Sequence, residues 1–325
     1  MRTDGTEWRN RLRRIREANN DAAWAMAEYI SETPCAITQK LMEQVNPGGT
    51  LPEEAVYAAL MAGFCGINEN DRETNGYFSR AVKRLDTRVY LNDPYLASIR
   101  FPDAVSGKWR FTHYCYRPYE AFVRDDIMLG PGTVETPSVG FFTERFVYPA
   151  VEQDGREWMA VKPSEIETMR GPLSEISGKV AVFGLGLGYF AYMATLNQAV
   201  KEIDIIEIDN DAISLFSRHI LPQIQNRDKI AHIIKQDAFE YMSDGMEARK
   251  YDFAFVDLWH DASDGLPMYI RAKRLERLNP DVKFIYWVEK TLRSAWRWNE
   301  FERIIDSSMD EEEALYSLSA GILPE

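Results

Sequence analysis

Three acidic side chains stand where short apolar runs of this sequence end. Glu207 closes one run, Asp237 follows the next, and Asp257 follows a third. A carboxylate at the end of a strand can accept hydrogen bonds from ribose hydroxyls or from an amino group, or take a proton from an attacking nucleophile. The three acids therefore predict a site that binds a nucleotide-like ligand beside a centre of group transfer.

A glycine-rich segment precedes these acids. Gly184-Leu185-Gly186-Leu187-Gly188 follows an apolar run and leads into a helical pattern. Glycine lets the backbone approach a ligand closely, and the first turn of a helix offers unpaired N–H groups. The segment is a weak signal alone, but Glu207 comes about twenty residues later, a spacing typical of nucleotide-binding folds. A helix-capping role for Glu207 is the alternative, and Asp209 or Asp211 can serve as that cap instead.

Asp237 has two compatible interpretations. It can accept a hydrogen bond from the amino group of adenine, with the neighbouring backbone at Ala238 facing the base. It also fits the N-cap of a helix, because Glu240 stands three residues later and completes a capping-box pattern. Both roles can coexist at one residue.

The elements that must position these residues follow from hydrophobic periodicity. Beyond residue 178, short apolar runs alternate with helical segments, and the runs cover residues 179–183, 203–208, 230–234, 253–256 and 282–288. Five buried strands with intervening helices predict an α/β fold with a Rossmann-like parallel sheet. Ligands of such sheets bind beyond the carboxyl ends of the strands, at the point where the strand order reverses. The predicted sheet therefore brings the glycine segment and the three acids to one edge.

The preceding residues have a different pattern. Residues 6–30 repeat apolar side chains at helical spacing, residues 88–150 are rich in aromatic and β-branched residues, and Asp154-Gly155 predicts a β-hairpin turn. A short helix is expected from Pro163, ending at Gly171-Pro172. The predicted organisation is a mostly helical domain over residues 1–120, a strand-rich connection with the hairpin over residues 121–175, and a cofactor-binding domain with a helical C-terminal end over residues 176–325.

Composition narrows the class of protein. A net charge of −13 disfavours nucleic acid as a partner. The 3 cysteines are too widely spaced for a disulfide framework or a metal-binding pair, so no metal is expected and a reducing cytoplasm is preferred. No apolar run reaches the roughly 20 residues that cross a membrane. We expect a cytoplasmic protein with a small-molecule substrate and no nucleic-acid or membrane partner, and a homodimer is left open.

Four stretches share a known pattern, namely VAVFGLGLG (180–188), IDIIEIDNDAI (203–213), IIKQDAFEYM (233–242) and YDFAFVD (251–257). In them the chain resembles the class I S-adenosylmethionine-dependent methyltransferase family, and most closely its spermidine-synthase-like branch. The resemblance covers about a third of the chain. It implies contacts with S-adenosylmethionine as the cofactor. The residues so implicated are Gly184, Leu185, Gly186 and Gly188 at its amino-acid part, Glu207 and Ile208 at the ribose, Asp237 and Ala238 at the adenine, and Asp257 at the reactive carbon.

Two features depart from that branch. Aminopropyltransferases carry a second acid three positions after the first, among small residues, whereas this chain reads Asp257-Leu258-Trp259-His260-Asp261. The family usually ends its sheet with an antiparallel strand pair, whereas the residues after Glu289 have a helical pattern. The sheet is therefore expected to be truncated at its C-terminal edge, and the aromatic residues between Tyr90 and Tyr148 are expected to help cover the site.

The leading interpretation is a methyltransferase that uses S-adenosylmethionine and acts on a small molecule, with an amine considered as the acceptor. Asp257 is the expected base, helped by His260 or Asp261. Packing for the histidine and helix capping for Asp261 are their structural alternatives. Three other functions are kept: an aminopropyltransferase that uses the decarboxylated cofactor, a non-catalytic cofactor-binding protein, and an NAD-dependent oxidoreductase. The last is suggested by the GxGxxA pattern over residues 186–191.

Overall fold

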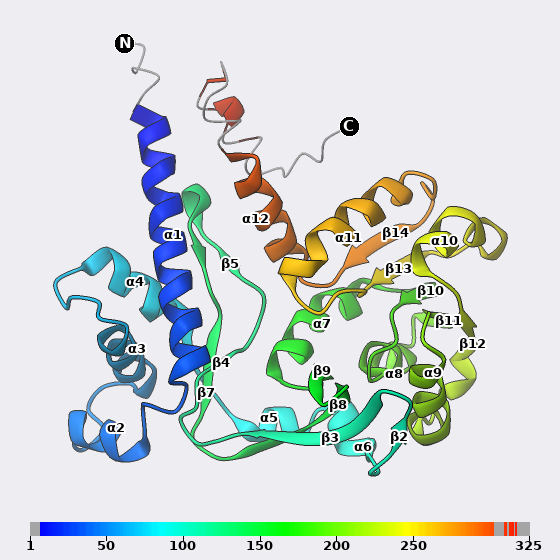
Figure 1. Ribbon diagram of the computed structural model, residues 1–325, viewed down its shortest axis with the longest axis horizontal. Helices are drawn as coiled ribbons and strands as arrows, with labels where there is room; N and C mark the ends of the chain where they lie inside the picture. Colours follow the sequence, from blue (N-terminus) through cyan, green and yellow to red (C-terminus); the bar gives the residue numbers. More distant parts are fainter. Residues whose placement is uncertain (1–6, 302–308, 311, 315, 317–325) are drawn as a thin grey trace. The chain divides into compact units, whose positions relative to one another are not determined.

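The computed structural model describes residues 7–301, 309–310, 312–314 and 316 (Figure 1). The chain forms two compact units, neither continuous in sequence. The first comprises Met1–Thr87, Tyr116–Phe146 and Arg293–Glu325, and the second comprises Arg88–Cys115 and Val147–Leu292. The sequence predicts three consecutive parts, with boundaries after residues 120 and 175, whereas these units are two and discontinuous. The three-part domain organisation stays a prediction.

The second unit is built on a five-stranded parallel sheet (Figure 1). Its strands are β10 (Gly178–Phe183), β11 (Val200–Glu207), β12 (Ile230–Lys235), β13 (Phe253–Val256) and β14 (Lys283–Tyr286). Their spatial order is β12-β11-β10-β13-β14, and neighbouring strands are parallel throughout the sheet. Each strand coincides with one predicted apolar run, so the predicted Rossmann-like α/β sheet is confirmed. The order reverses at β10, and this places the expected ligand site beyond its carboxyl end.

Helices lie between these strands in sequence, as the alternating pattern predicts, namely α8 (Tyr189–Leu196), α9 (Asn210–Leu215), α10 (Ala238–Glu240) and α11 (Ala262–Glu276). Helix α7 (Pro163–Glu175) precedes the first strand, and α12 (Glu289–Asn299) follows the last and continues into the first unit. The last four residues of β10 are consecutively buried, which is typical of a strand covered on both faces. Among the described residues β14 is the last strand and α12 follows it, as expected for a sheet that ends early.

Helix α7 is longer than predicted, because it continues through Gly171-Pro172 to Glu175. Proline removes one backbone donor, which favours a helix end. Here the last turn is held by Asn197, whose side-chain amide donates to the carbonyls of Leu173 and Ile176. Those carbonyls would otherwise lack partners at the helix terminus.

A second sheet of this unit has the order β2-β3-β8-β9. Its strands are β2 (Val105–Ser106), β3 (Trp109–Tyr116), β8 (Phe146–Gln153) and β9 (Arg156–Ala160). Strands β8 and β9 form the predicted antiparallel hairpin, and both turn residues have positive φ, 52° at Asp154 and 78° at Gly155. Two short helices, α5 (Thr87–Leu91) and α6 (Pro94–Ser98), precede this sheet.

The first unit is mostly helical over its N-terminal residues, as predicted. Its helices are α1 (Glu7–Glu32), α2 (Gln39–Val45), α3 (Glu53–Phe64) and α4 (Arg72–Ala81), and its strands are β1 (Val82–Leu85), β4 (Phe122–Val123), β5 (Met128–Leu129), β6 (Glu135–Thr136) and β7 (Val139–Phe142). In its core, Tyr57 stacks on Phe141 with ring centroids 4.0 Å apart. No helix in the described part of the chain has the length and apolar character needed to span a membrane.

Candidate functional site

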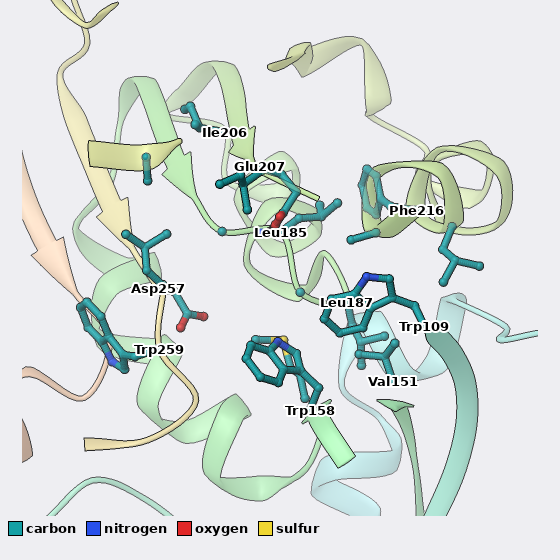
Figure 2. Close-up of a pocket in the computed structure, with 18 of the residues that line it drawn as sticks. Trp109, Val151, Trp158, Leu185, Leu187, Ile206, Glu207, Phe216, Asp257 and Trp259 are labelled. Atoms are coloured by element: carbon teal, nitrogen blue, oxygen red, sulfur yellow. Dashed lines mark hydrogen bonds between the residues drawn. The ribbon is translucent and has the colours of Figure 1, made fainter. Parts of the chain in front are cut away.

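A cavity of about 280 Å³ lies in the second unit, beyond the carboxyl ends of β10, β11, β12 and β13 (Figure 2). Each of these strands delivers lining residues at or just after its carboxyl end, and strands β3, β8 and β9 supply further lining. The predicted site residues that line it are Gly184, Leu185, Gly186, Glu207, Ile208, Asp237, Ala238 and Asp257. The aromatic segment expected to cover the site contributes Trp109 and Phe111.

The glycine loop needs glycine both for its conformation and for its close contacts. Gly184 has φ of 94°, and a Cβ atom there would lie 2.0 Å from the carbonyl oxygen of Asp257. Gly186 has φ of 50°, and a Cβ atom there would lie 2.0 Å from Sδ of Met159. Gly188 does not line the cavity; it is the N-cap of α8, where its φ is 75°. The loop is therefore pressed between the end of β13 and strand β9.

Glu207 holds the glycine loop from the neighbouring strand. The backbone N–H of Leu185 donates to its Oε2 at 3.1 Å, and the N–H of Asp209 donates to its Oε1 at 2.8 Å. Burial raises the pKa of Glu207, and the backbone hydrogen bonds from Asp209 and Leu185 oppose that rise. Asp209, not Glu207, caps α9, so the capping alternative does not require Glu207. Each carboxylate oxygen keeps a lone pair for a ligand hydroxyl.

Asp237 combines its two predicted interpretations. It is the N-cap of α10, where its Oδ1 accepts from the N–H of Phe239 at 2.8 Å and of Glu240 at 3.0 Å. It also lines the cavity together with Ala238. The adenine contact inferred for these two residues stays a prediction, and the capping bonds fix the backbone that would make it.

Asp257 has the features of a ligand-binding acid. Figure 2 shows its carboxyl group pointing into the cavity. Its Oδ1 is buried and has no hydrogen-bond partner among the described residues. Burial raises the pKa of Asp257 well above its ordinary value, and the negative charge of Glu165 raises it further. A buried carboxyl oxygen without a partner is rare in folded proteins, so this atom marks where a ligand donor is expected.

Glu165 does not line the cavity, but its charge acts on Asp257, and the sequence did not single it out for chemistry. It stands in the first turn of α7, is 8% exposed, and its Oε2 has no partner among the described residues. The hydrogen bond from Trp287 Nε1 to Thr168 Oγ1, 2.9 Å long, ties this part of α7 to the end of β14. In sequence, an acid in a first helical turn indicates only a favourable helix dipole. Its charge coupling to Asp257 depends on the tertiary structure.

Glu165 predicts how stability depends on pH. Burial raises its pKa from 4.5 to about 7. The folded state therefore binds a proton that the unfolded state has lost, and stability falls as pH rises from about 4.5 to 7, by about 3 kcal/mol for this group. Glu165→Gln should match the wild type near pH 4.5 and be more stable by about 2–3 kcal/mol at pH 8. Urea unfolding at both pH values measures this. Stability that changes with pH equally in the wild type and in Glu165→Gln would rule out this role of Glu165. The control is Glu175→Gln, whose carboxylate is exposed on the same helix and whose stability should follow the wild type.

His260 and Asp261 lie outside the cavity lining. The side chain of Asp261 accepts from the N–H of Ser263 at 2.7 Å and forms a capping box with Asp264 at the start of α11. His260 is exposed, and its ring centroid lies 5.6 Å from that of Trp158. His260 Nδ1 also lies 3.5 Å from Asp261 Oδ2. The catalytic help expected from both residues stays a prediction.

The charged lining residues of the cavity are all acidic, namely Glu207, Asp237 and Asp257. No lysine, arginine or histidine lines it among the described residues. Such a lining favours a cationic ligand and disfavours a pyrophosphate. The N–H of Leu185, which a dinucleotide phosphate would need, is already bonded to Glu207. The geometry therefore disfavours the NAD-dependent alternative.

A second acidic cluster lies outside the lining. Ligand-type atoms of Glu202, Asp204 and His232 all lie within 4.8 Å of one another. Lys179 Nζ lies 2.6 Å from Glu202, and an Arg249 nitrogen lies 3.2 Å from Asp204. These two cations already offset the carboxylate charge, so the cluster is accounted for as an ion-pair network.

Comparison with known proteins supports one branch of the resemblance. A family model described as the spermine/spermidine synthase domain matches residues 174–282. The chain is also similar to the crystal structure of spermidine synthase from Thermotoga maritima, with 17% identity and a TM-score of 0.30, over 39% of this chain and 45% of that chain. The chain thus spans less than half the length of that protein. No curated protein matches the sequence.

The family match corrects the cofactor prediction. S-adenosylmethionine as a methyl-donor cofactor is wrong, because the matching model describes the spermine and spermidine synthases. That branch transfers an aminopropyl group from the decarboxylated form of the molecule. The match therefore favours the aminopropyltransferase alternative over the methyltransferase interpretation.

Proposed function

We propose that this protein is an aminopropyltransferase of the spermidine synthase type, which transfers the aminopropyl group of decarboxylated S-adenosylmethionine to a primary amine. The observation that carries the proposal is the acidic cavity at the strand ends, into which Asp257 points a carboxyl group with an unpartnered oxygen. Both substrates are cationic, and an acidic lining attracts them. The family match to residues 174–282 supports the same reaction.

We assign a part of the donor to each element of the lining. Glu207 accepts the ribose hydroxyls, and Asp237 with Ala238 receives the adenine. The glycine loop lies along the chain that carries the sulfur, where its missing Cβ atoms leave room for close approach. These assignments put the transferred carbon beside Asp257, at the end of β13.

The transfer is a direct displacement. The acceptor nitrogen attacks the carbon bonded to the sulfonium sulfur, so that a C–N bond forms and the C–S bond breaks. The bonding pair stays on sulfur, which leaves as the neutral thioether of 5′-methylthioadenosine. Asp257 takes the proton that the acceptor nitrogen loses. The sulfonium is already activated, so alignment can supply roughly 7–11 kcal/mol of the rate enhancement, and a positioned base adds a factor of about 10² to 10⁴.

The test is product analysis with a panel of amines. The purified protein is incubated with decarboxylated S-adenosylmethionine and, separately, with putrescine, spermidine and monoamines of similar length. We expect equal amounts of 5′-methylthioadenosine and of one aminopropylated amine by mass spectrometry. Omission of the amine is the control. Absence of nucleoside product with every amine, or methylated product from S-adenosylmethionine in its place, would contradict the proposal.

A further inference from the structure

Two tryptophans form an aromatic side of the cavity. Trp109 of β3 and Trp158 of β9 both line it, with ring centroids 5.8 Å apart and ring planes at 76°. Figure 2 shows Trp158 lying between Asp257 and Trp109 in that view, on the side toward which the Asp257 carboxyl points. An indole ring therefore borders the region where the reacting atoms are expected.

The two indoles differ in what already contacts them. Lys108 Nζ lies 5.1 Å from the ring centroid of Trp109, so that ring already has a cation over it. Within the described residues, no lysine or arginine lies over Trp158, whose ring neighbours are Trp109 and His260. Trp158 is 40% exposed, whereas Trp109 is 7% exposed. Trp158 is thus the indole that can receive a cation from the cavity.

Trp158 stands at the register shift of the β8–β9 pairing, between Glu157, which pairs with Glu152, and Met159. The next residue of β9, Met159, pairs with Val151 of β8, and its Sδ packs against Gly186 so closely that a Cβ atom there would lie 2.0 Å away. The indole therefore borders the same cavity as the glycine loop and the carboxyl of Asp257. The proposed function places the sulfur in this cavity, between the glycine loop and Asp257.

We propose that Trp158 selects the charge of the donor, because its indole binds the sulfonium group by a cation–π interaction and does not hold the neutral thioether product. This inference rests on the proposed function. Tryptophan has the strongest cation–π attraction of the aromatic side chains. Transfer moves the positive charge from sulfur to the acceptor nitrogen, next to Asp257, so the contact with Trp158 weakens as the product forms. The same residue then favours substrate binding and product release.

The experiment compares two ligands that differ at sulfur. Decarboxylated S-adenosylmethionine carries the sulfonium, and S-(5′-adenosyl)-3-thiopropylamine is the same molecule without the sulfonium methyl and its charge. Calorimetric titration of Trp158→Leu should show about three- to thirtyfold weaker binding of the sulfonium. Binding of the thioether should change less than about twofold, because no cation–π contact is lost. Trp158→Phe, which keeps an aromatic face, should lie between Trp158→Leu and the wild type.

The controls separate charge selection from loss of contact area. Leucine and phenylalanine both keep an apolar side chain, and Trp24→Leu removes a tryptophan of the first unit that is 76% exposed. Thermal unfolding of each variant checks the fold. Equal losses for both ligands in Trp158→Leu, or no loss for either, would overturn the inference while the proposed function stands. A wild-type protein that binds neither ligand would overturn the proposed function and this inference together.

Discussion

Asp257→Asn is expected to lower the turnover of aminopropyl transfer by at least about a hundredfold while donor affinity changes no more than a few fold. Asparagine keeps the size of the side chain but cannot take the proton from the acceptor nitrogen. The side chain lies at the end of β13 with Oδ1 unpartnered, so the substitution breaks no hydrogen bond of Oδ1 to the described residues. Steady-state kinetics and a separate donor titration measure the two quantities.

The pH dependence of turnover gives a second readout for Asp257. Burial and the charge of Glu165 raise the pKa of Asp257 well above its usual value. The carboxyl therefore gains its basic form only as pH rises through that elevated pKa, and the wild-type rate should increase with pH over this range. Asp257→Asn should lack this rise. Wild-type turnover in Asp257→Asn would refute the role of Asp257 as the base. Normal turnover in His260→Ala would mean that His260 gives no catalytic help and only packs against Trp158.

Glu207→Ala is expected to weaken donor binding by roughly ten- to a hundredfold. The substitution removes the acceptor for the ribose hydroxyls and also the carboxylate to which Leu185 and Asp209 donate. A hydrogen bond to a charged group contributes about 1.5–3 kcal/mol, which corresponds to this range. Calorimetric titration measures the affinity, and thermal unfolding checks that the sheet remains folded.

Two further variants test how Glu207 acts. Glu207→Gln keeps one acceptor oxygen for the loop, so its loss of affinity should be smaller than that of Glu207→Ala. Asp237→Ala should weaken binding through the adenine end of the ligand. Unchanged affinity in both Glu207→Ala and Asp237→Ala would exclude the assigned nucleoside subsite.

The distinction between a methyl donor and an aminopropyl donor is not visible at the strand ends. Both molecules carry the same nucleoside and a sulfonium, so Glu207 and Asp237 would serve either one. The two donors differ in the carboxylate of the amino-acid chain, and the two reactions differ in which carbon on the sulfur is attacked, so the differences lie away from the nucleoside. For that reason the sequence supported both reactions, and the family match to residues 174–282 was needed to correct the donor.

The sequence by itself determined the parallel sheet, the hairpin and the strand-end positions of Glu207, Asp237 and Asp257. Buried strands, glycine turns and helix caps leave local patterns, because each depends on neighbouring residues. Only the tertiary structure decided that Glu165 couples to Asp257, and that Trp158 borders the same cavity. Those relations join residues about a hundred positions apart, and periodicity does not encode which distant elements pack together. Sheet pairing and burial create the charges and contacts of the site, so they exist only in the folded chain.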